Sequence, residues 1–267
     1  LSRVRDKGSY EAEKILCRII EFHRSRNQNG KAWNYVEDNI QIERFRCQVV
    51  EKRIKEKKFD EAKKLIHDYI DKKENKYHSD DWDKYLLQIA RREKDVPAIR
   101  GISYSFIENE FDKQYYSIYK SAFSPDEWPE KFEALFRHYE RKKDFGDDPA
   151  ADLLAAEGMA ERLMGHMEKK LSLEKMERYY RFFADAFPEN TLALFRKAVD
   201  LYAENNTGRS YYEHIVETFK KMEKIPGGDA AVAEMKDQYR TRYKNRRAMM
   251  EILNRNEPSC RMLQKVR

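Results

Sequence analysis

Apolar residues recur at steps of three and four between residues 188 and 253, and two hinges interrupt the pattern. The hinges lie at Asn205 to Gly208 and at Pro226 to Gly228. Positions three and four apart share one side of an α-helix, so each segment has one apolar face. The apolar positions are Leu192, Phe195, Val199 and Tyr202, then Tyr212, Ile215, Phe219 and Met222, then Val232, Met235 and Tyr239. Such faces are buried only when each helix stacks on its neighbours.

The same helical spacing continues upstream through most of the chain. One stretch, Phe59, Asp60, Glu61 and Ala62, has an order that resembles the second helix of a tetratricopeptide hairpin. The pattern predicts at least ten helices and no sheet. We therefore expect an all-α protein, a right-handed superhelical array of helical hairpins that forms a tetratricopeptide-like α-solenoid.

One helix start is predicted in detail. Ser124 can cap a helix whose first position is Pro125, and Glu127 can reach back to the capping residue. Apolar residues at helical spacing follow from Trp128 onward. We therefore expect this helix to begin at Pro125.

The composition changes at Lys142 to Pro149, where charge, glycine and proline interrupt the helical pattern. All nine methionines lie after residue 158, and we expect them to fill gaps in a core rather than to form a binding surface. The sequence thus predicts an N-terminal helical-repeat half over residues 1–143, a C-terminal helical-repeat half over residues 149–254, and a tail over residues 255–267.

The runs GRSYYEHIVETFKKMEKIPGG and YRTRYKNRRAMMEIL, within residues 208–253, carry a family resemblance. Their order resembles the C-terminal helical-repeat region of bacterial SWIM zinc finger proteins. In that family an arginine, a tyrosine three residues on, a Gly-Gly pair and a closing arginine-rich helix start follow one another. Ala248 stands where the family tends to carry a proline. The matching positions are Arg209, Tyr212, Gly227, Gly228, Arg246 and Arg247.

The zinc finger that names the family is absent from this chain. It needs a Cys-x-Cys pair followed by Cys-x-His, whereas the only cysteines are Cys17, Cys47 and Cys260. The six histidines are scattered singly, and no two of them stand four residues apart. We therefore expect no metal site and no cofactor here. The resemblance implies that a zinc finger lies upstream, in a part missing from a truncated chain.

No catalytic signature accompanies the helical pattern. The sequence has no Gly-x-x-x-x-Gly-Lys phosphate loop and no Gly-x-Ser-x-Gly elbow. Asp80, Asp81 and Asp83 lack the spacing of a calcium loop and precede a helix, where carboxylates are favoured by the helix dipole. We predict a protein that is not an enzyme, and keep a hydrolase or nuclease as the weakest alternative.

Hydropathy and cysteine spacing indicate the cellular compartment that we expect. No apolar run approaches the length that spans a bilayer, and no signal-peptide series opens the chain. Three cysteines with wide spacing suit a reducing compartment. We therefore expect a cytoplasmic protein without a membrane partner.

The net charge of +6 is distributed unevenly, as +6 over residues 1–100, −6 over residues 101–205 and +6 over residues 206–267. One concentrated basic run stands out near the C-terminus. It could contact nucleic-acid phosphates, or it could form a structural hinge in which arginines pair with Asp237 and Glu251, and we favour the hinge. With Arg209, which belongs to the family pattern, the candidate interaction residues are Arg209, Arg240, Arg242, Lys244, Arg246 and Arg247.

These observations predict a non-enzymatic scaffold for protein–protein interaction, which binds a protein or peptide partner. The alternative is a nucleic-acid-binding accessory module that uses the basic C-terminal run or the absent upstream zinc finger.

Overall fold

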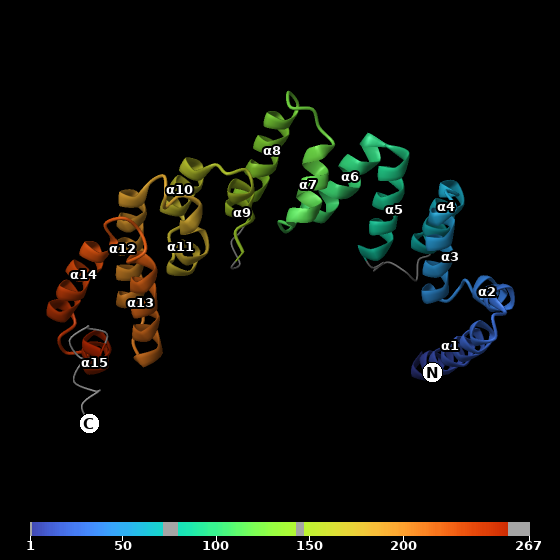
Figure 1. Ribbon diagram of the computed structural model, residues 1–267, viewed down its shortest axis with the longest axis horizontal. Coiled ribbons are helices and arrows are strands. Elements are labelled where there is room, and N and C mark those ends of the chain that lie inside the picture. Colours follow the sequence, from blue (N-terminus) through green and yellow to red (C-terminus); the bar gives the residue numbers. More distant parts are fainter. Residues whose placement is uncertain (1, 72–79, 143–146, 256–267) are drawn as a thin grey trace. The chain divides into compact units, whose positions relative to one another are not determined.

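The computed structural model describes residues 2–71, 80–142 and 147–255. Over these ranges the chain forms fifteen α-helices and one short 3₁₀ helix, with no strand (Figure 1). The all-α fold class is therefore confirmed for the described part of the chain, as is the prediction of at least ten helices.

The helices fall into two compact units, Leu1–Ser124 and Pro125–Arg267. The first unit contains α1 (Ser2–Ser25), α2 (Asn29–Asp38), α3 (Glu43–Lys55), α4 (Phe59–Ile70), α5 (Asp80–Glu93), α6 (Val96–Ile107) and α7 (Lys113–Ser121). The second contains α8 (Trp128–Glu140), α9 (Pro149–Ala156), α10 (Ala160–Lys169), α11 (Leu173–Tyr179), η2 (Tyr180–Phe182), α12 (Pro188–Asn205), α13 (Arg209–Met222), α14 (Gly228–Arg242) and α15 (Arg247–Arg255).

The compositional boundary at Lys142 to Pro149 lies inside the second unit, where α8 and α9 pack against each other. Residues 143–146 and 256–267, which hold most of the predicted tail and Cys260, lie outside the described residues. The division into residues 1–143, 149–254 and 255–267 therefore stays a prediction.

The predicted helix start at Pro125 is wrong. Residues 125–127 form a turn, and α8 begins at Trp128 with Pro129 in its first turn. A proline in the first turn costs the helix nothing, because the missing N–H would have no partner inside the helix there. Pro129 meets that condition, and the earlier proline occupies the turn instead.

Four helical hairpins share one turn, in which the first or second residue after the first helix is left-handed. Its φ is 59° at Asn27, 59° at Lys57, 60° at Lys94 and 66° at Gly158. The second helix begins two residues later in every case, giving the pairs α1/α2, α3/α4, α5/α6 and α9/α10. The two helices of each pair pack on each other.

A single type of hydrogen bond closes these four turns. The N–H after the left-handed residue donates to the carbonyl five residues before it, the 6→1 bond of a Schellman motif. It satisfies a carbonyl that the end of the first helix would otherwise leave unpaired. The bonds run from Gln28 to His23 (2.9 Å), Lys58 to Arg53 (2.8 Å), Asp95 to Ala90 (2.9 Å) and Met159 to Leu154 (3.0 Å).

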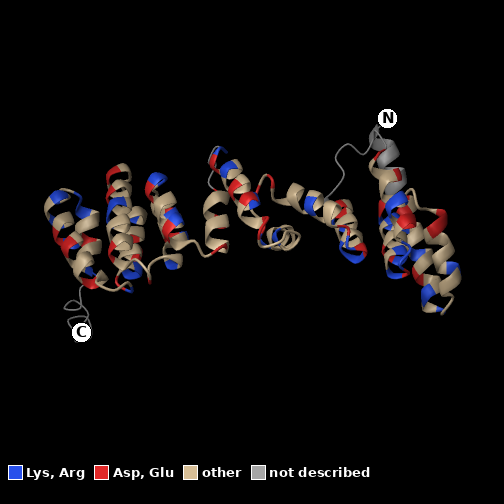
Figure 2. Ribbon diagram, turned by 90° about the horizontal axis from the view of Figure 1, so that it is seen from above, with Lys and Arg blue, Asp and Glu red and all other residues tan. Residues whose placement is uncertain are grey.

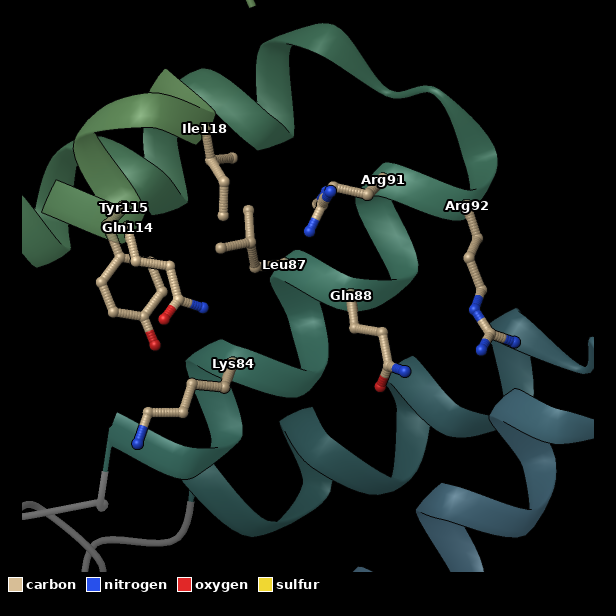
Figure 3. Close-up of a pocket in the computed structure, with 8 residues that line it drawn as sticks. All are labelled: Lys84, Leu87, Gln88, Arg91, Arg92, Gln114, Tyr115 and Ile118. Carbon is tan, nitrogen blue, oxygen red and sulfur yellow. The ribbon is translucent and has the colours of Figure 1, made fainter. Parts of the chain in front are cut away.

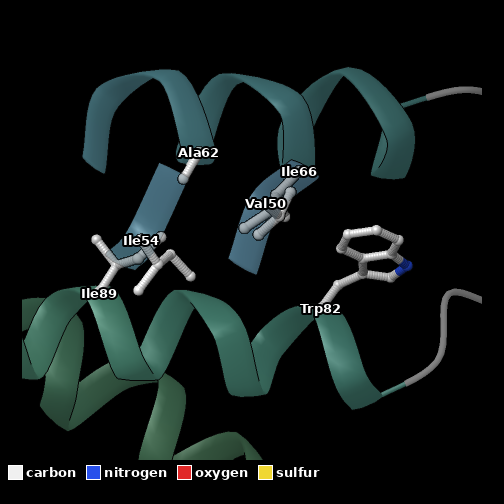
Figure 4. Packing of buried hydrophobic residues seen from close by; sticks show 6 residues of the cluster. All are labelled: Val50, Ile54, Ala62, Ile66, Trp82 and Ile89. Atoms are coloured by element: carbon white, nitrogen blue, oxygen red, sulfur yellow. The ribbon is translucent and has the colours of Figure 1, made fainter. Parts of the chain in front are cut away.

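Three consecutive helices of the first unit share one apolar core (Figure 4). Each contributes two side chains that are at most 2 % exposed. Ala62 has the smallest side chain of the six, which lets α4 lie close to its neighbours. The six are Val50 and Ile54 from α3, Ala62 and Ile66 from α4, and Trp82 and Ile89 from α5.

In the second unit the later helices pack on their second neighbours as well as on the next helix. α12 contacts both α13 and α14, and α13 contacts both α14 and α15. The hydroxyl of Tyr239 in α14 donates to Asp200 of α12 at 2.7 Å. α12 and α13 therefore each pack on the two helices that follow them in the chain.

A buried carboxylate joins α9, α10 and α11. Asp148 is 2 % exposed, caps α9 by accepting from the N–H of Ala151 at 3.1 Å, and accepts from His166 Nε2 at 3.0 Å and Lys175 Nζ at 2.9 Å. Burial raises the pKa of this carboxyl, but the bonds from His166 and Lys175 outweigh burial and hold the pKa below its usual range. Asp148 therefore stabilises the fold in its ionised form.

Replacing Asp148 with asparagine removes this charge and should lower the free energy of unfolding by roughly 3 kcal/mol at neutral pH, because Lys175 and His166 lose their anion. The native pKa is depressed, so the contribution is complete above the ordinary aspartate pKa of about 4 and disappears as the pH falls below it. Urea unfolding over a pH series should show the two proteins converging in acid.

The matched control is Asp147→Asn, because Asp147 is 87 % exposed in its side chain and pairs with Arg178 at 3.5 Å. An exposed pair contributes little, so this variant should unfold within about 0.5 kcal/mol of the wild type. Equal stability of Asp148→Asn and Asp147→Asn at neutral pH would contradict the role assigned to Asp148.

Candidate functional site

The candidate residues of the basic run lie at helix ends in the second unit. Figure 2 shows basic and acidic residues close together on these helices. The residues are Arg209 at the start of α13, Arg240 and Arg242 in the last turn of α14, Lys244 in the following turn, Arg246 directly before α15 and Arg247 at its first position.

Arg246 caps the C-terminal end of α12. Its guanidinium donates to the carbonyl of Ala203 at 2.6 Å, approaches the carbonyl of Asn206 at 3.5 Å and lies 4.3 Å from the ring centroid of Tyr243. α12 has no basic residue in its own last turn. Arg246 therefore supplies, from a distant part of the chain, the positive charge that a helix C-terminus favours.

Three other arginines of the set pair with carboxylates, and one of these pairs, Arg240 with Asp237, is of the kind that the hinge interpretation expected for the basic run. The pair between Arg209 and Glu251 is 2.7 Å long and joins α13 to α15, and the bond from Arg209 lowers the pKa of Glu251. Arg240 pairs with Asp237 at 2.7 Å within α14. The third pair, Arg242 with Glu204, joins α14 to α12.

Lys244 and Arg247 are exposed and make no bond with another residue in the described ranges. Two free cations of the run thus remain for an external anion. The use of the run in nucleic-acid binding stays a prediction, because no contact within the molecule tests it.

A groove in the first unit brings together residues that the sequence did not single out. It lies between α5 and α7 and has a volume of about 500 Å³ (Figure 3). The α5 residues recur at steps of three and four, so they share one face of that helix. The lining residues are Lys84, Leu87, Gln88, Arg91 and Arg92 from α5, and Gln114, Tyr115 and Ile118 from α7.

The groove is basic on one wall and apolar at its base. Its eight lining residues include three cations and no carboxylate. Figure 3 shows Leu87 and Ile118 facing each other across the groove, with Arg91 beside them. Leu87 is 4 % exposed, so the floor is formed by a side chain that also belongs to the core.

The three cations differ in how far they are already engaged. Lys84 pairs with Asp81 at 2.8 Å, and Arg92 donates to the carbonyl of Ile54 at 3.1 Å. Arg91 is exposed and makes no polar contact with any residue that the structure describes. Its guanidinium is therefore the group of this groove most available to a ligand.

The α7 wall is fixed by contacts behind it. The ring of Tyr115 stacks on Phe106 of α6, with centroids 4.1 Å apart and an interplanar angle of 14°. Asp112 caps α7 by accepting from the N–H groups of Gln114 and Tyr115 at 2.7 and 3.0 Å. These contacts set the start of α7, so the groove is formed before any ligand arrives.

The described residues hold no group of three or more His, Cys, Asp or Glu side chains placed to bind a metal ion. Burial and the negative charges of Glu43 and Glu51 raise the pKa of Cys47 to about 11. This thiol is protonated near neutral pH and is a poor nucleophile. Among the residues that the structure describes, no helix combines the length and apolar character needed to cross a membrane.

Comparisons with protein-family models, curated proteins and solved structures give no match to this chain. The fold and the geometry of the groove therefore carry the functional inference.

Replacing Arg246 with alanine should lower the free energy of unfolding by about 1–2 kcal/mol, because the end of α12 loses its charged donor. Arg247→Ala is the matched control, since Arg247 is the exposed neighbour without a described partner. It should change stability by less than about 0.5 kcal/mol. Urea unfolding of both variants measures the difference.

The double variant Arg246→Ala, Arg247→Ala separates the structural interpretation from nucleic-acid binding. If the run has a structural role, the double variant should have lower thermal stability than the wild type. Its affinity for DNA and RNA in gel-shift titrations at physiological salt should stay as weak as that of the wild type. Submicromolar binding that the double substitution abolishes would instead assign the run to phosphate contacts.

Proposed function

We propose that this chain is a non-enzymatic scaffold for protein–protein interaction, built from helical hairpins stacked as a tetratricopeptide-like α-solenoid. The groove between α5 and α7 is the observation that carries this proposal. It presents a preformed surface with an unengaged guanidinium, two glutamine amides and an apolar floor. Helical-repeat proteins bind partners on extended surfaces of this kind.

The shared hairpin turn supports the repeat architecture. Asn27 and Lys57 lie 30 positions apart, and Lys57 and Lys94 lie 37 positions apart, close to the tetratricopeptide period of about 34 residues. The fifth residue after the left-handed position is a buried alanine in two successive hairpins, Ala32 and Ala62. A small residue at this point lets the second helix of a hairpin pack closely on its neighbours.

We further propose that the chain is the helical-repeat part of a larger SWIM zinc finger protein in the cytoplasm. Two of the positions that carry the resemblance favour glycine for physical reasons. Gly227 has a φ of 81°, and a Cβ on Gly228 would lie 1.8 Å from the carbonyl oxygen of Met222. A full reading frame with an upstream Cys-x-Cys and Cys-x-His set would support this assignment.

A nucleic-acid-binding accessory module is the second candidate function. Its support is the exposure of Lys244 and Arg247, which have no partner in the described part of the chain. The gel-shift titration of the double arginine variant decides between the two candidates.

Selection from a random-peptide display library tests the scaffold function without assuming the ligand's chemistry. Peptides enriched on the wild-type chain should bind at least tenfold more weakly to Ile118→Arg, because the long side chain fills the groove. Ser117→Arg is the matched control, since Ser117 is exposed on α7 and does not line the groove. Binding to this control should stay within twofold of the wild type.

Two outcomes would contradict the proposal. One is a selection that enriches no peptide above background. The other is a set of enriched peptides that bind the wild type, Ile118→Arg and Ser117→Arg equally.

A further inference from the structure

We propose that the groove between α5 and α7 binds an extended acidic segment of a partner protein, in which one carboxylate pairs with Arg91 and an aliphatic side chain packs on Leu87 and Ile118. This inference rests on the proposed scaffold function, because it names the partner chemistry for the same groove. Charge, apolar surface and spacing each contribute to it.

The charge of Arg91 in the groove is not balanced by any residue that the structure describes. Two other arginines of the first unit are engaged: Arg53 pairs with Glu37 at 2.9 Å, and Arg100 donates to the carbonyl of Ala122 at 2.9 Å. Arg91 has no such acceptor among the described residues, and no carboxylate lines the groove. A planar guanidinium pairs best with a carboxylate or phosphate, to which it can donate two parallel hydrogen bonds.

A second cation lies along the same face of α5. Lys84 and Arg91 are seven residues apart, which is about 10.5 Å along a helix. A polyproline II segment presents the same face every three residues, or about 9 Å. Two acidic residues three positions apart would therefore meet both cations, and the exposed pair between Lys84 and Asp81 would cost little to exchange.

The apolar floor lies between these two charges. Leu87 stands between Lys84 and Arg91 on α5, and Ile118 faces it from α7 (Figure 3). An aliphatic side chain between the two acidic residues would reach this floor. The amides of Gln88 and Gln114 stand on opposite walls, and each can bind both a backbone N–H and a backbone carbonyl of an extended chain.

A nucleic-acid strand suits the groove less well than a peptide does. All three cations come from α5, whereas α7 contributes an amide, a phenol and an aliphatic side chain. A phosphate backbone would leave the floor of Leu87 and Ile118 without an apolar partner. A peptide with acidic and aliphatic side chains would contact both the α5 wall and the α7 wall.

Fluorescence anisotropy with defined probes tests the inference on the full chain. The acidic probe is a fluorescein-labelled peptide with Asp-Leu-Pro-Asp between Gly-Ser flanks. One control probe replaces both aspartates with asparagine, and another replaces the leucine with serine. At physiological ionic strength each control probe should bind at least tenfold more weakly than the acidic probe.

Variants of the chain locate the charge that the probe recognises. Arg91→Glu should weaken the acidic probe at least tenfold and should bind a Lys-Leu-Pro-Lys probe better than the wild type does. The affinity of Arg91→Lys for the acidic probe should lie between those of the wild type and Arg91→Glu, because lysine keeps the charge but lacks the paired donors of the guanidinium. Arg18→Glu is the matched control, since Arg18 is an exposed residue of α1 without a described partner, and it should change binding less than twofold.

Three outcomes would overturn the inference: equal binding of the acidic and asparagine probes, acidic binding that Arg91→Glu leaves unchanged, or tighter binding of a single-stranded RNA probe that Arg91→Glu abolishes. If the display-selected peptides depend on Ile118 but show no preference for acidic residues, the scaffold function stands and this inference fails.

Discussion

The 6→1 hydrogen bond at a left-handed residue is the constraint on which the fold depends. It closes a connection of two or three residues, so the second helix of a hairpin lies against the first. Three of the four left-handed residues are Asn27, Lys57 and Lys94, which pay about 1–2 kcal/mol each for a conformation that glycine adopts freely. Burial of the paired helices must offset that cost, because a short amphipathic helix is marginal alone.

The hairpins gain their stability from neighbours, through apolar cores in some places and polar bonds in others. α3, α4 and α5 share an apolar core, and polar bonds such as the one from Arg92 to the carbonyl of Ile54 join the same helices. α9, α10 and α11 instead meet at the buried charge of Asp148. Groups that pair inside the molecule are not available to a partner, whereas Arg91 lines the groove between α5 and α7 and has no polar partner among the described residues.

Helical spacing was sufficient to predict the fold class, because an apolar face depends on local sequence alone. The left-handed turn at Gly158 could be expected from the sequence, because glycine adopts positive φ readily. The residue type at Lys57 and Lys94 gives no such indication. The pair between Arg240 and Asp237 was predicted, because the two residues lie three positions apart on one helix, whereas the pair between Arg209 and Glu251 joins distant parts of the chain and was not. The groove was missed because it requires α5 and α7 to meet, and its only local trace is the spacing of Lys84, Gln88 and Arg91.

Amide hydrogen exchange at the four turns tests the shared hairpin most directly. The N–H groups of Gln28, Lys58, Asp95 and Met159 donate the closing bonds. Each should exchange as slowly as the interior amides of the helices that it joins, because its bond opens only when the hairpin opens. Exchange at the rate of an unstructured loop at these four positions would contradict the account.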